Sequence, residues 1–220
     1  MRKFVLLTGF EPFAGDIVNP SMEATRCLQG KTFELNGDEV VLQAVAIPTE
    51  FHRSIEILQQ AIEDIHPEIV ICVGQAGGRM HMTPEKIAIN LDDARIPDNA
   101  GQQPIDRPIV ENGPTAYWSS LPVKAMVQAM RDAGIPSSVS YSAGTYVCNH
   151  LFYGLMHLLA TQYPHIRGGG FVHIPFLPEQ TVQRSEPSMS LEMIVQGLEI
   201  CARTAMAEKK DIFLVTGTEQ

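Results

Sequence analysis

Short apolar runs alternate with helix-patterned segments along this 220-residue chain. Runs rich in Val and Ile predict buried strands, and apolar residues that recur every three or four positions predict helices. Strands that alternate with helices favour a mostly parallel sheet covered on both faces. We expect strands at 3–9, 39–48, 67–78, 86–91, 138–142 and 168–178, and helices at 19–29, 49–65, 123–133, after Cys148 and from Leu191 to Ala205.

Composition and length fit one compact unit. Hydrophobic residues make up 45% and charged residues 19% of the chain, a balance typical of globular proteins. No internal repeat, low-complexity tract or long linker divides the sequence. We therefore expect a single α/β domain over residues 1–220. The expected architecture is a three-layer α/β/α fold with a twisted, mostly parallel central sheet.

Charge and termini limit the partners and the location. A net charge of −9 disfavours nucleic acid and anionic membranes as partners. The apolar run near the N-terminus is short and is broken by Gly9 and Pro12, so it does not resemble a signal peptide or a membrane span. The four cysteines are widely spaced, which is typical of reduced thiols. We expect a cytoplasmic protein.

In parallel sheets of this kind, ligands bind at the carboxyl ends of the strands. Five strand ends are therefore candidates: "TGFEPF", "IPTE", "GQAGG", "SAGTYVC" and "HIPF". A long loop at 92–114, rich in Pro, Gly, Asp and Asn, begins near the same edge. Loops of that length in compact domains are usually functional or mobile.

Cys148 lies in "YSAGTYVCNHLF", between a predicted strand and a predicted helix. The positive end of a helix can turn a thiol into a nucleophile held largely as thiolate, although an ordinary buried cysteine fits the same position. A nucleophilic thiol needs a base. His173 ends a predicted strand at the same edge, whereas His150, two residues from Cys148, points to another side of the helix.

The acid that would orient this base has several candidates: Glu50, Glu85, Asp92 and Asp93. Spacing alone favours a salt bridge between Glu85 and Lys86 or Arg79. Phe10 and Phe13 either line a pocket for a flat apolar group or pack on a neighbouring helix. The glycine turn at 74–78 lacks the spacing of a nucleotide-binding loop, so a tight turn is the simpler interpretation.

Taken together, these segments resemble type I pyroglutamyl peptidases, a family of cysteine peptidases. The nucleophile motif of that family, Ser-x-x-Ala-Gly-x-aromatic-x-Cys-Asn, stands here as "SYSAGTYVCN". Its glutamate motif stands as "GQAGGRMHMTPEKIAIN", and "GFEPF", "NPS", "DARIPDN" and "HIPF" also match in order. Ala14 and Met82 depart from the usual residues, and Tyr146 takes a position that phenylalanine often holds.

The resemblance implies removal of N-terminal pyroglutamate through a thioester on Cys148. It implies His173 as acid and base, Glu85 as the residue that orients His173, and the Cys148 N–H and Arg95 as oxyanion donors. The implied substrate-binding residues are Phe10, Phe13, Thr49, Gln75, Ile96, Tyr146 and Val147.

The resemblance also implies peptide substrates, no metal or organic cofactor, and a homo-oligomer, either a tetramer or a dimer. Two alternatives remain open on the same architecture. One is an enzyme like the nucleoside phosphorylases, and the other is a binding protein without catalysis. Neither of them needs Cys148, Glu85 and His173 together.

Overall fold

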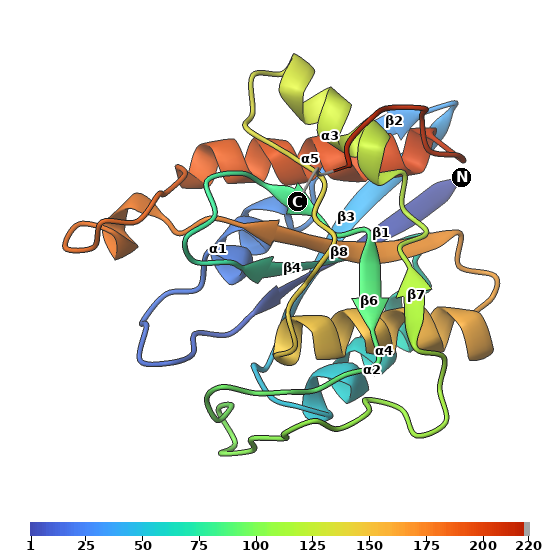
Figure 1. Cartoon of the computed structure of the whole chain (residues 1–220). Coiled ribbons are helices and arrows are strands. Elements are labelled where there is room, and N and C mark those ends of the chain that lie inside the picture. Colours follow the sequence, from blue (N-terminus) through green and yellow to red (C-terminus); the bar gives the residue numbers. More distant parts are fainter. Residues whose placement is uncertain (218–220) are drawn as a thin grey trace.

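The computed structural model describes residues 1–217, so the last three residues of the predicted 1–220 domain lie outside the described residues. The chain forms a six-stranded sheet in the order β2-β3-β1-β4-β8-β5 (Figure 1). The four inner strands run parallel, and the two edge strands run antiparallel to their neighbours. The strands are β1 (Arg2–Phe10), β2 (Thr32–Leu35), β3 (Asp38–Ile47), β4 (Ile69–Gln75), β5 (Thr83–Pro84) and β8 (Gly168–Ile174).

Helices lie against both faces of this sheet. Side chains of α1, α3 and α5 join one buried apolar cluster, and side chains of α2 and α4 join the other. Successive residues of β1 alternate between the two, with Leu7 in the first cluster and Leu6 in the second. The helices are α1 (Pro20–Leu28), α2 (Arg53–Ile65), α3 (Val123–Asp132), α4 (Val147–Thr161) and α5 (Leu191–Ala207), with a 3₁₀ turn, η1, at Pro178–Gln180.

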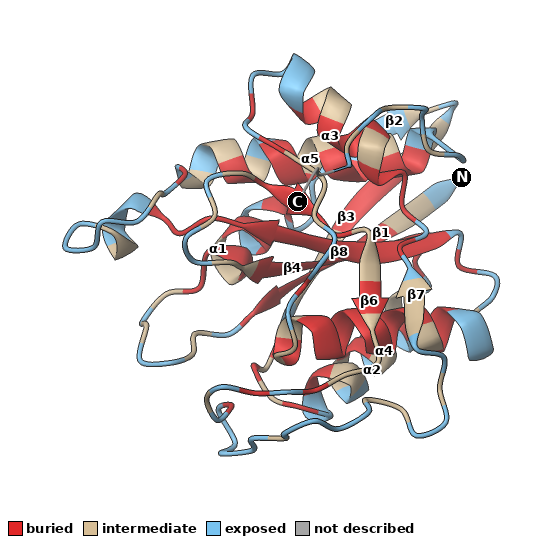
Figure 2. Ribbon diagram, in the orientation of Figure 1, coloured by how far each residue is buried: buried red, intermediate tan, exposed pale blue. Residues whose placement is uncertain are grey.

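The inner strands are largely apolar in their central parts because both of their faces are covered. All seven residues of β8 are buried, and so are six of the seven residues of β4 (Figure 2). This is the pattern expected of a parallel sheet between helices. The alternating pattern read from the sequence therefore gave the correct class, a mostly parallel α/β protein.

A small antiparallel pair, β6 (Ile87–Ile89) and β7 (Ala116–Trp118), flanks the long loop at 92–114. The first turn of α4 fixes this pair. The Asn149 amide donates to the carbonyl oxygens of Ile89 and Leu91 and accepts from the Ile89 N–H. The start of α4 and the beginning of the loop are thus held by one buried side chain.

Two predicted elements differ from the structure. The predicted strand at 138–142 is an extended segment that makes only single bridges, from Ser137 to Met82 and from Ser140 to Glu85. Ser140 donates its hydroxyl to the carbonyl oxygen of Ser142, a local bond that competes with a strand ladder. The predicted helix at 49–65 begins four residues later, at Arg53.

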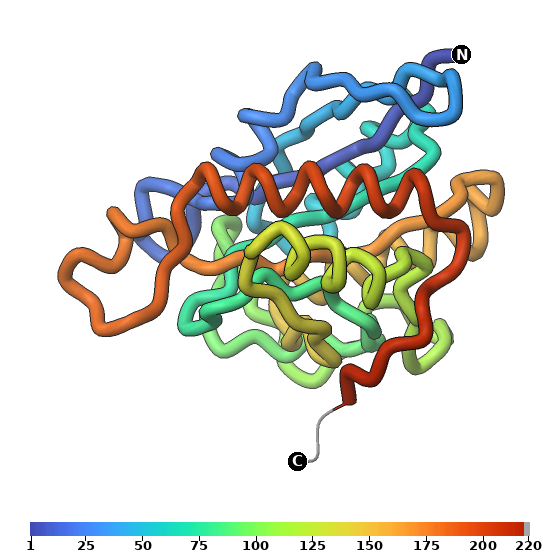
Figure 3. Tube along the Cα trace, turned by 90° about the horizontal axis from the view of Figure 1, so that it is seen from above, coloured from blue at the N-terminus to red at the C-terminus, as the bar shows by residue number. Residues whose placement is uncertain are grey.

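The segment after α5 runs back beside α3 (Figure 3). Helix α3 has no side-chain cap of its own. The Asp211 carboxylate accepts from the N–H groups of Lys124 and Ala125, each at 3.0 Å, and so caps α3 from a distant part of the chain.

Among residues 1–217, no helix has both the length and the apolar character that crossing a membrane requires.

Candidate active site

The carboxyl ends of β4 and β8 bring Cys148 and His173 to one face of the sheet. Gly74 on β4 pairs in register with His173 on β8. Cys148 is the second residue of α4, and its Sγ lies 3.0 Å from the position that a Cβ on Gly74 would occupy. Paired residues of adjacent strands point to the same face, so the thiol lies beside the strand that carries His173.

The His173 ring is oriented by Glu85. Its Nδ1 lies 2.7 Å from Glu85 Oε1, and both side chains are buried. Because the carboxylate can only accept, Nδ1 carries the proton and donates it. Nε2 is then the unprotonated nitrogen, which is the state a general base needs. This is the only hydrogen bond of the His173 ring among residues 1–217.

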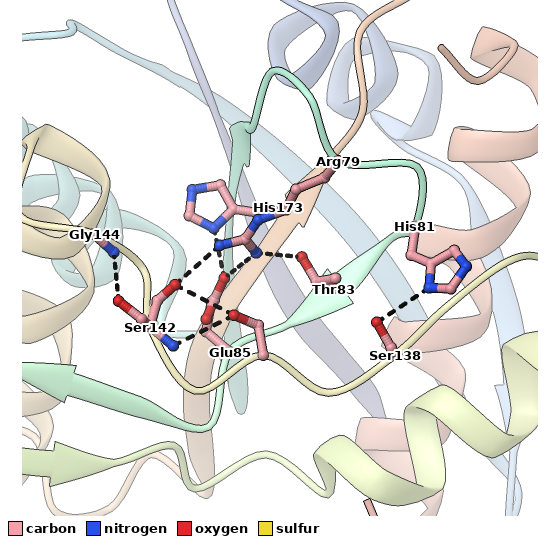
Figure 4. Close-up of polar contacts among 9 residues, drawn as sticks. Arg79, His81, Thr83, Glu85, Ser138, Ser142, Gly144 and His173 are labelled. Carbon is pink, nitrogen blue, oxygen red and sulfur yellow. Dashed lines mark hydrogen bonds and ion pairs between the residues drawn. The ribbon is translucent and has the colours of Figure 1, made fainter. Parts of the chain in front are cut away.

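Arg79 binds the same carboxylate oxygen. Its Nη1 lies 2.7 Å from Glu85 Oε1 and 2.6 Å from Thr83 Oγ1, and its Nη2 donates to the carbonyl oxygen of Ser142 at 2.9 Å (Figure 4). The two interpretations of Glu85, salt bridge and histidine partner, therefore hold at once. Lys86, the other candidate for the salt bridge, lies 3.4 Å from Asp211 instead.

Burial favours an uncharged thiol and an uncharged imidazole. Burial, and then the nearby Glu85 carboxylate, raise the pKa of Cys148 to about 12. Burial also lowers the pKa of His173, although its hydrogen bond to the Glu85 carboxylate acts in the opposite direction. The raised pKa contradicts a Cys148 held largely as thiolate, and its causes are the desolvation of the anion and the nearby Glu85 charge.

Glu85 itself stays ionised. Burial alone would raise its pKa, but the hydrogen bond from His173 and the charge of Arg79 help to bring the pKa below its usual value. Its second oxygen, Oε2, is buried without a hydrogen-bond partner among residues 1–217. Both strong donors act on Oε1, so the orientation of this one oxygen decides the position of the His173 ring.

The start of α4 offers donors to a developing oxyanion. Tyr146 precedes the helix, and no side chain caps the first turn. The N–H groups of a first helical turn have no partner within the helix, and Cys148 contributes one of them. This arrangement agrees with the predicted oxyanion role of the Cys148 N–H.

A small cavity of about 240 Å³ lies near this helix start. Phe13 and Tyr146 lie 6.1 Å apart between ring centroids, and the Tyr146 hydroxyl donates to the carbonyl oxygen of Pro97. Four predicted site residues thus meet in one place, including Arg95 from the long loop. The cavity is lined by Phe13, Asp93, Arg95, Ile96, Thr145 and Tyr146.

Three other predicted pocket residues are largely buried in the surrounding core. The Phe10 ring packs on Phe171 of β8, with centroids 6.4 Å apart, rather than on a neighbouring helix. Thr49 donates its hydroxyl to the carbonyl oxygen of Glu11, and Val147 is fully buried. The side chain of a fourth, Gln75, accepts from Gln180 at 2.9 Å.

His150 and Asp92 form a second buried pair. His150 Nδ1 lies 2.7 Å from Asp92 Oδ2, and its Nε2 accepts from the backbone N–H of His52 at 2.8 Å. His52 has a positive φ of 59°, a strained turn that directs this N–H toward the ring. Both ring nitrogens are occupied, so His150 has no free nitrogen to serve Cys148, in agreement with the sequence interpretation.

Gly74 is expected to be required for thiol placement. A Cβ at this position would lie 2.7 Å from the Phe171 ring and 3.0 Å from Cys148 Sγ, closer than side chains normally approach. We predict that Gly74→Ala displaces the thiol and lowers kcat roughly tenfold or more. The matched control is Gly168→Ala at the start of β8, where an added Cβ would meet Ile69 at 3.3 Å and would not reach the thiol. Wild-type kcat in Gly74→Ala would contradict this placement.

Residues 1–217 contain no group of three or more His, Cys, Asp or Glu side chains arranged to hold a metal ion.

Known sequences and structures match nearly the whole chain. The sequence model of the pyroglutamyl peptidase family matches residues 3–208. The chain belongs to this family. Pyrrolidone-carboxylate peptidase of Bacillus licheniformis is 58% identical over 212 residues, 96% of each chain. The Bacillus subtilis (strain 168) protein of that name is 55% identical over 218 residues, 99% of each chain.

Solved pyroglutamyl peptidases share the fold. The crystal structure of Bacillus amyloliquefaciens pyroglutamyl peptidase I superposes with a TM-score of 0.92 at 52% identity, covering 96% of this chain and 100% of that one. The Thermococcus litoralis pyrrolidone carboxyl peptidase superposes with a TM-score of 0.87 at 38% identity, covering 93% of each chain. The chain is thus similar to pyroglutamyl peptidases across almost its full length.

The structure shows the surroundings of two residues that depart from the pyroglutamyl peptidase pattern, Ala14 and Met82. Ala14 adopts a positive φ of 53°, a conformation that glycine adopts without strain, and it is exposed. Met82 is fully buried and packs against Gly197 of α5.

Proposed function

We propose that this chain is a cysteine peptidase, an omega-peptidase that removes N-terminal pyroglutamate from peptides. The family membership supports the reaction. The single observation that supports the residue roles is the buried Glu85–His173 hydrogen bond on the sheet face that carries Cys148. The proposed trio is Cys148 as nucleophile, His173 as acid and base, and Glu85 as the residue that orients His173.

In the acylation step, His173 Nε2 takes the thiol proton while Sγ forms a bond with the pyroglutamyl carbonyl carbon. The carbonyl oxygen becomes an oxyanion, which the Cys148 N–H and the Arg95 guanidinium stabilise. The tetrahedral intermediate collapses as the C–N bond breaks, and His173 gives its proton to the leaving amine. The peptide departs and a thioester remains on Cys148.

Deacylation reverses these roles. His173 removes a proton from water, and the resulting hydroxide attacks the thioester carbonyl carbon. The C–S bond then breaks, Sγ regains the proton from His173, and pyroglutamate leaves. Because the thiol and the imidazole are both uncharged at rest, the first proton transfer of each half-reaction starts from a neutral donor and forms an imidazolium. The Glu85 carboxylate stabilises the imidazolium that forms between the two transfers.

Specificity for pyroglutamate would follow from contacts with its lactam ring. The lactam ring is flat and neutral, whereas an N-terminal proline carries a charged amine and lacks the lactam carbonyl. The cavity beside α4 is formed partly by Phe13, Ile96 and Tyr146, which would contact a flat, apolar ring face. Arg95 and Asp93 carry opposite charges in this lining, so they leave no net charge to bind an ionised substrate group. The backbone near Gln75 and Val147 would bind the lactam polar atoms, and Phe10 and Thr49 would complete the pocket wall.

The proposal also covers the layered architecture, the location and the assembly of the protein. Helices on both faces of the sheet support a three-layer α/β/α domain over residues 1–220, similar to phosphorylases and hydrolases. Four unpaired cysteines support a reducing, cytoplasmic location. The family resemblance supports a homo-oligomer, either a tetramer or a dimer. Sedimentation would test that assembly.

The function is tested by release of the arylamine from a pyroglutamyl arylamide and from the matching prolyl arylamide. We expect turnover of the first compound and at least a hundredfold lower kcat/KM for the second. Iodoacetamide should abolish the activity in a Cys27→Ala background, which removes the exposed thiol. Phosphate-dependent release of a base from nucleosides, without arylamide turnover, would support the phosphorylase alternative. Neither activity would support the binding protein.

A further inference from the structure

We propose that Arg79 is a positioning residue for the reaction, one that fixes the Glu85 carboxylate against His173 and connects it to the loop leading to Cys148. This inference deepens the proposed function and rests on it. The proposed trio assigns no role to Arg79, yet its guanidinium makes three contacts, all within 2.9 Å.

Arg79 and His173 share one oxygen of Glu85. Arg79 Nη1 and His173 Nδ1 each lie 2.7 Å from Glu85 Oε1, while Oε2 is buried without a partner among residues 1–217. A buried carboxylate normally divides its donors between two oxygens. Here the guanidinium holds Oε1 where the imidazole needs it. Without Arg79, Glu85 could rotate about its terminal bond and withdraw that oxygen from His173.

Arg79 also contacts the loop that leads to the nucleophile. Arg79 Nη2 donates to the carbonyl oxygen of Ser142, six residues before Cys148. The loop from Ser140 to Tyr146 has no strand ladder, so local bonds of this kind hold it. Thr83 completes the attachment by accepting from Nη1 at 2.6 Å. One side chain therefore links the acid, the base and the approach to the thiol.

The positive charge of Arg79 acts on both Cys148 and His173. The groups that act on the Cys148–His173 pair are the Glu85 carboxylate and the Arg79 guanidinium, with the Cys72 thiol also near Cys148. Arg79 lowers the pKa of both Cys148 and His173, and Glu85 raises both. Removing only the positive charge should therefore move both limbs of the pH profile to higher pH. A general loss of packing would not move both limbs in the same direction.

The test compares Arg79→Met, Arg79→Gln and Arg79→Lys with wild type in kcat, KM and the pH dependence of kcat/KM. We expect Arg79→Met and Arg79→Gln to lower kcat roughly tenfold to a hundredfold, the loss typical of residues that orient a reacting group, with KM nearly unchanged. Both limbs should shift to higher pH. Arg79→Lys keeps the charge, so its limbs should stay in place while kcat remains reduced. Arg203→Met, which removes an exposed ion pair on α5, is the control.

Alkylation of Cys148 by iodoacetamide separates this inference from the proposed function. In a Cys27→Ala background, the Arg79→Met variant should be alkylated more slowly than wild type at neutral pH. The pH at which its alkylation rate is half-maximal should be higher. If wild type releases no arylamine, the proposed function fails while alkylation still tests Arg79. Wild-type turnover with unchanged kcat, pH limbs and alkylation in Arg79→Met would overturn the inference. Failure of all three variants to fold would make Arg79 a folding residue and would also overturn it.

Discussion

Cys148→Ser is expected to reduce kcat by at least about 10³-fold. The serine oxygen would occupy nearly the position of Sγ beside Gly74, so binding should be retained and KM should change little. A hydroxyl, however, is far harder to deprotonate than a thiol. The weakly basic His173 cannot supply the difference, because burial lowers its pKa. Steady-state kinetics on the pyroglutamyl arylamide would measure the loss.

The matched control for this variant is Cys27→Ser. Cys27 is exposed on α1, and the family resemblance gives it no role. Its replacement should leave kcat and KM at wild-type values. Cys72 and Cys201 are unsuitable controls because both are buried and their replacement can cost stability. Substantial turnover by Cys148→Ser would show that another residue carries the acyl group.

Glu85→Gln is expected to lower kcat roughly 10²- to 10⁴-fold while the protein stays folded. The amide keeps the shape of the carboxylate but removes the charge that stabilises the imidazolium. Arg79 and His173 would then compete for one neutral oxygen, and the ring could adopt the tautomer with the proton on Nε2. That tautomer cannot accept the thiol proton.

The pH dependence distinguishes this variant from a variant of Arg79. The Glu85 carboxylate raises the pKa of both Cys148 and His173, so its loss should move both limbs of the pH profile to lower pH. This is opposite in sign to the shift expected for Arg79→Met. Glu56→Gln removes the carboxylate of an exposed 2.7 Å ion pair with Arg53 and should change neither kcat nor the limbs. Limbs of Glu85→Gln that move to higher pH would contradict the assigned charges.

Much of the fold could be predicted because the apolar composition of the central strands indicates that both of their faces are buried. β4 and β8 are almost entirely apolar since both faces are covered, with Gln75 and His173 as polar exceptions near their carboxyl ends. Helix α5 repeats its apolar residues along one side. The segment 138–142 has the same composition as a short strand. Its serines instead bond locally, and that outcome depends on loop contacts absent from any sequence pattern.

The site was predictable as a set of residues but not as an electrostatic state. Parallel strands that end at one edge place His173 near Cys148 from topology alone. The protonation of that pair depends on burial, which opposes the helix N-terminus and which the sequence does not give. The sequence predicts Arg79 only as a possible salt-bridge partner of Glu85. Its joint contact on Oε1 required coordinates, and so did the pairing of Asp92 with His150.

The central claim is that the Cys148 thiol carries the pyroglutamyl group as a thioester. The most direct measurement mixes the protein with an activated pyroglutamyl ester, quenches it in acid within milliseconds, and maps the modified peptide by mass spectrometry. We predict one pyroglutamyl group per chain, located on Cys148 and removed by hydroxylamine. Accumulation of pyroglutamate with no adduct on Cys148, or with the adduct on another residue, would contradict the account.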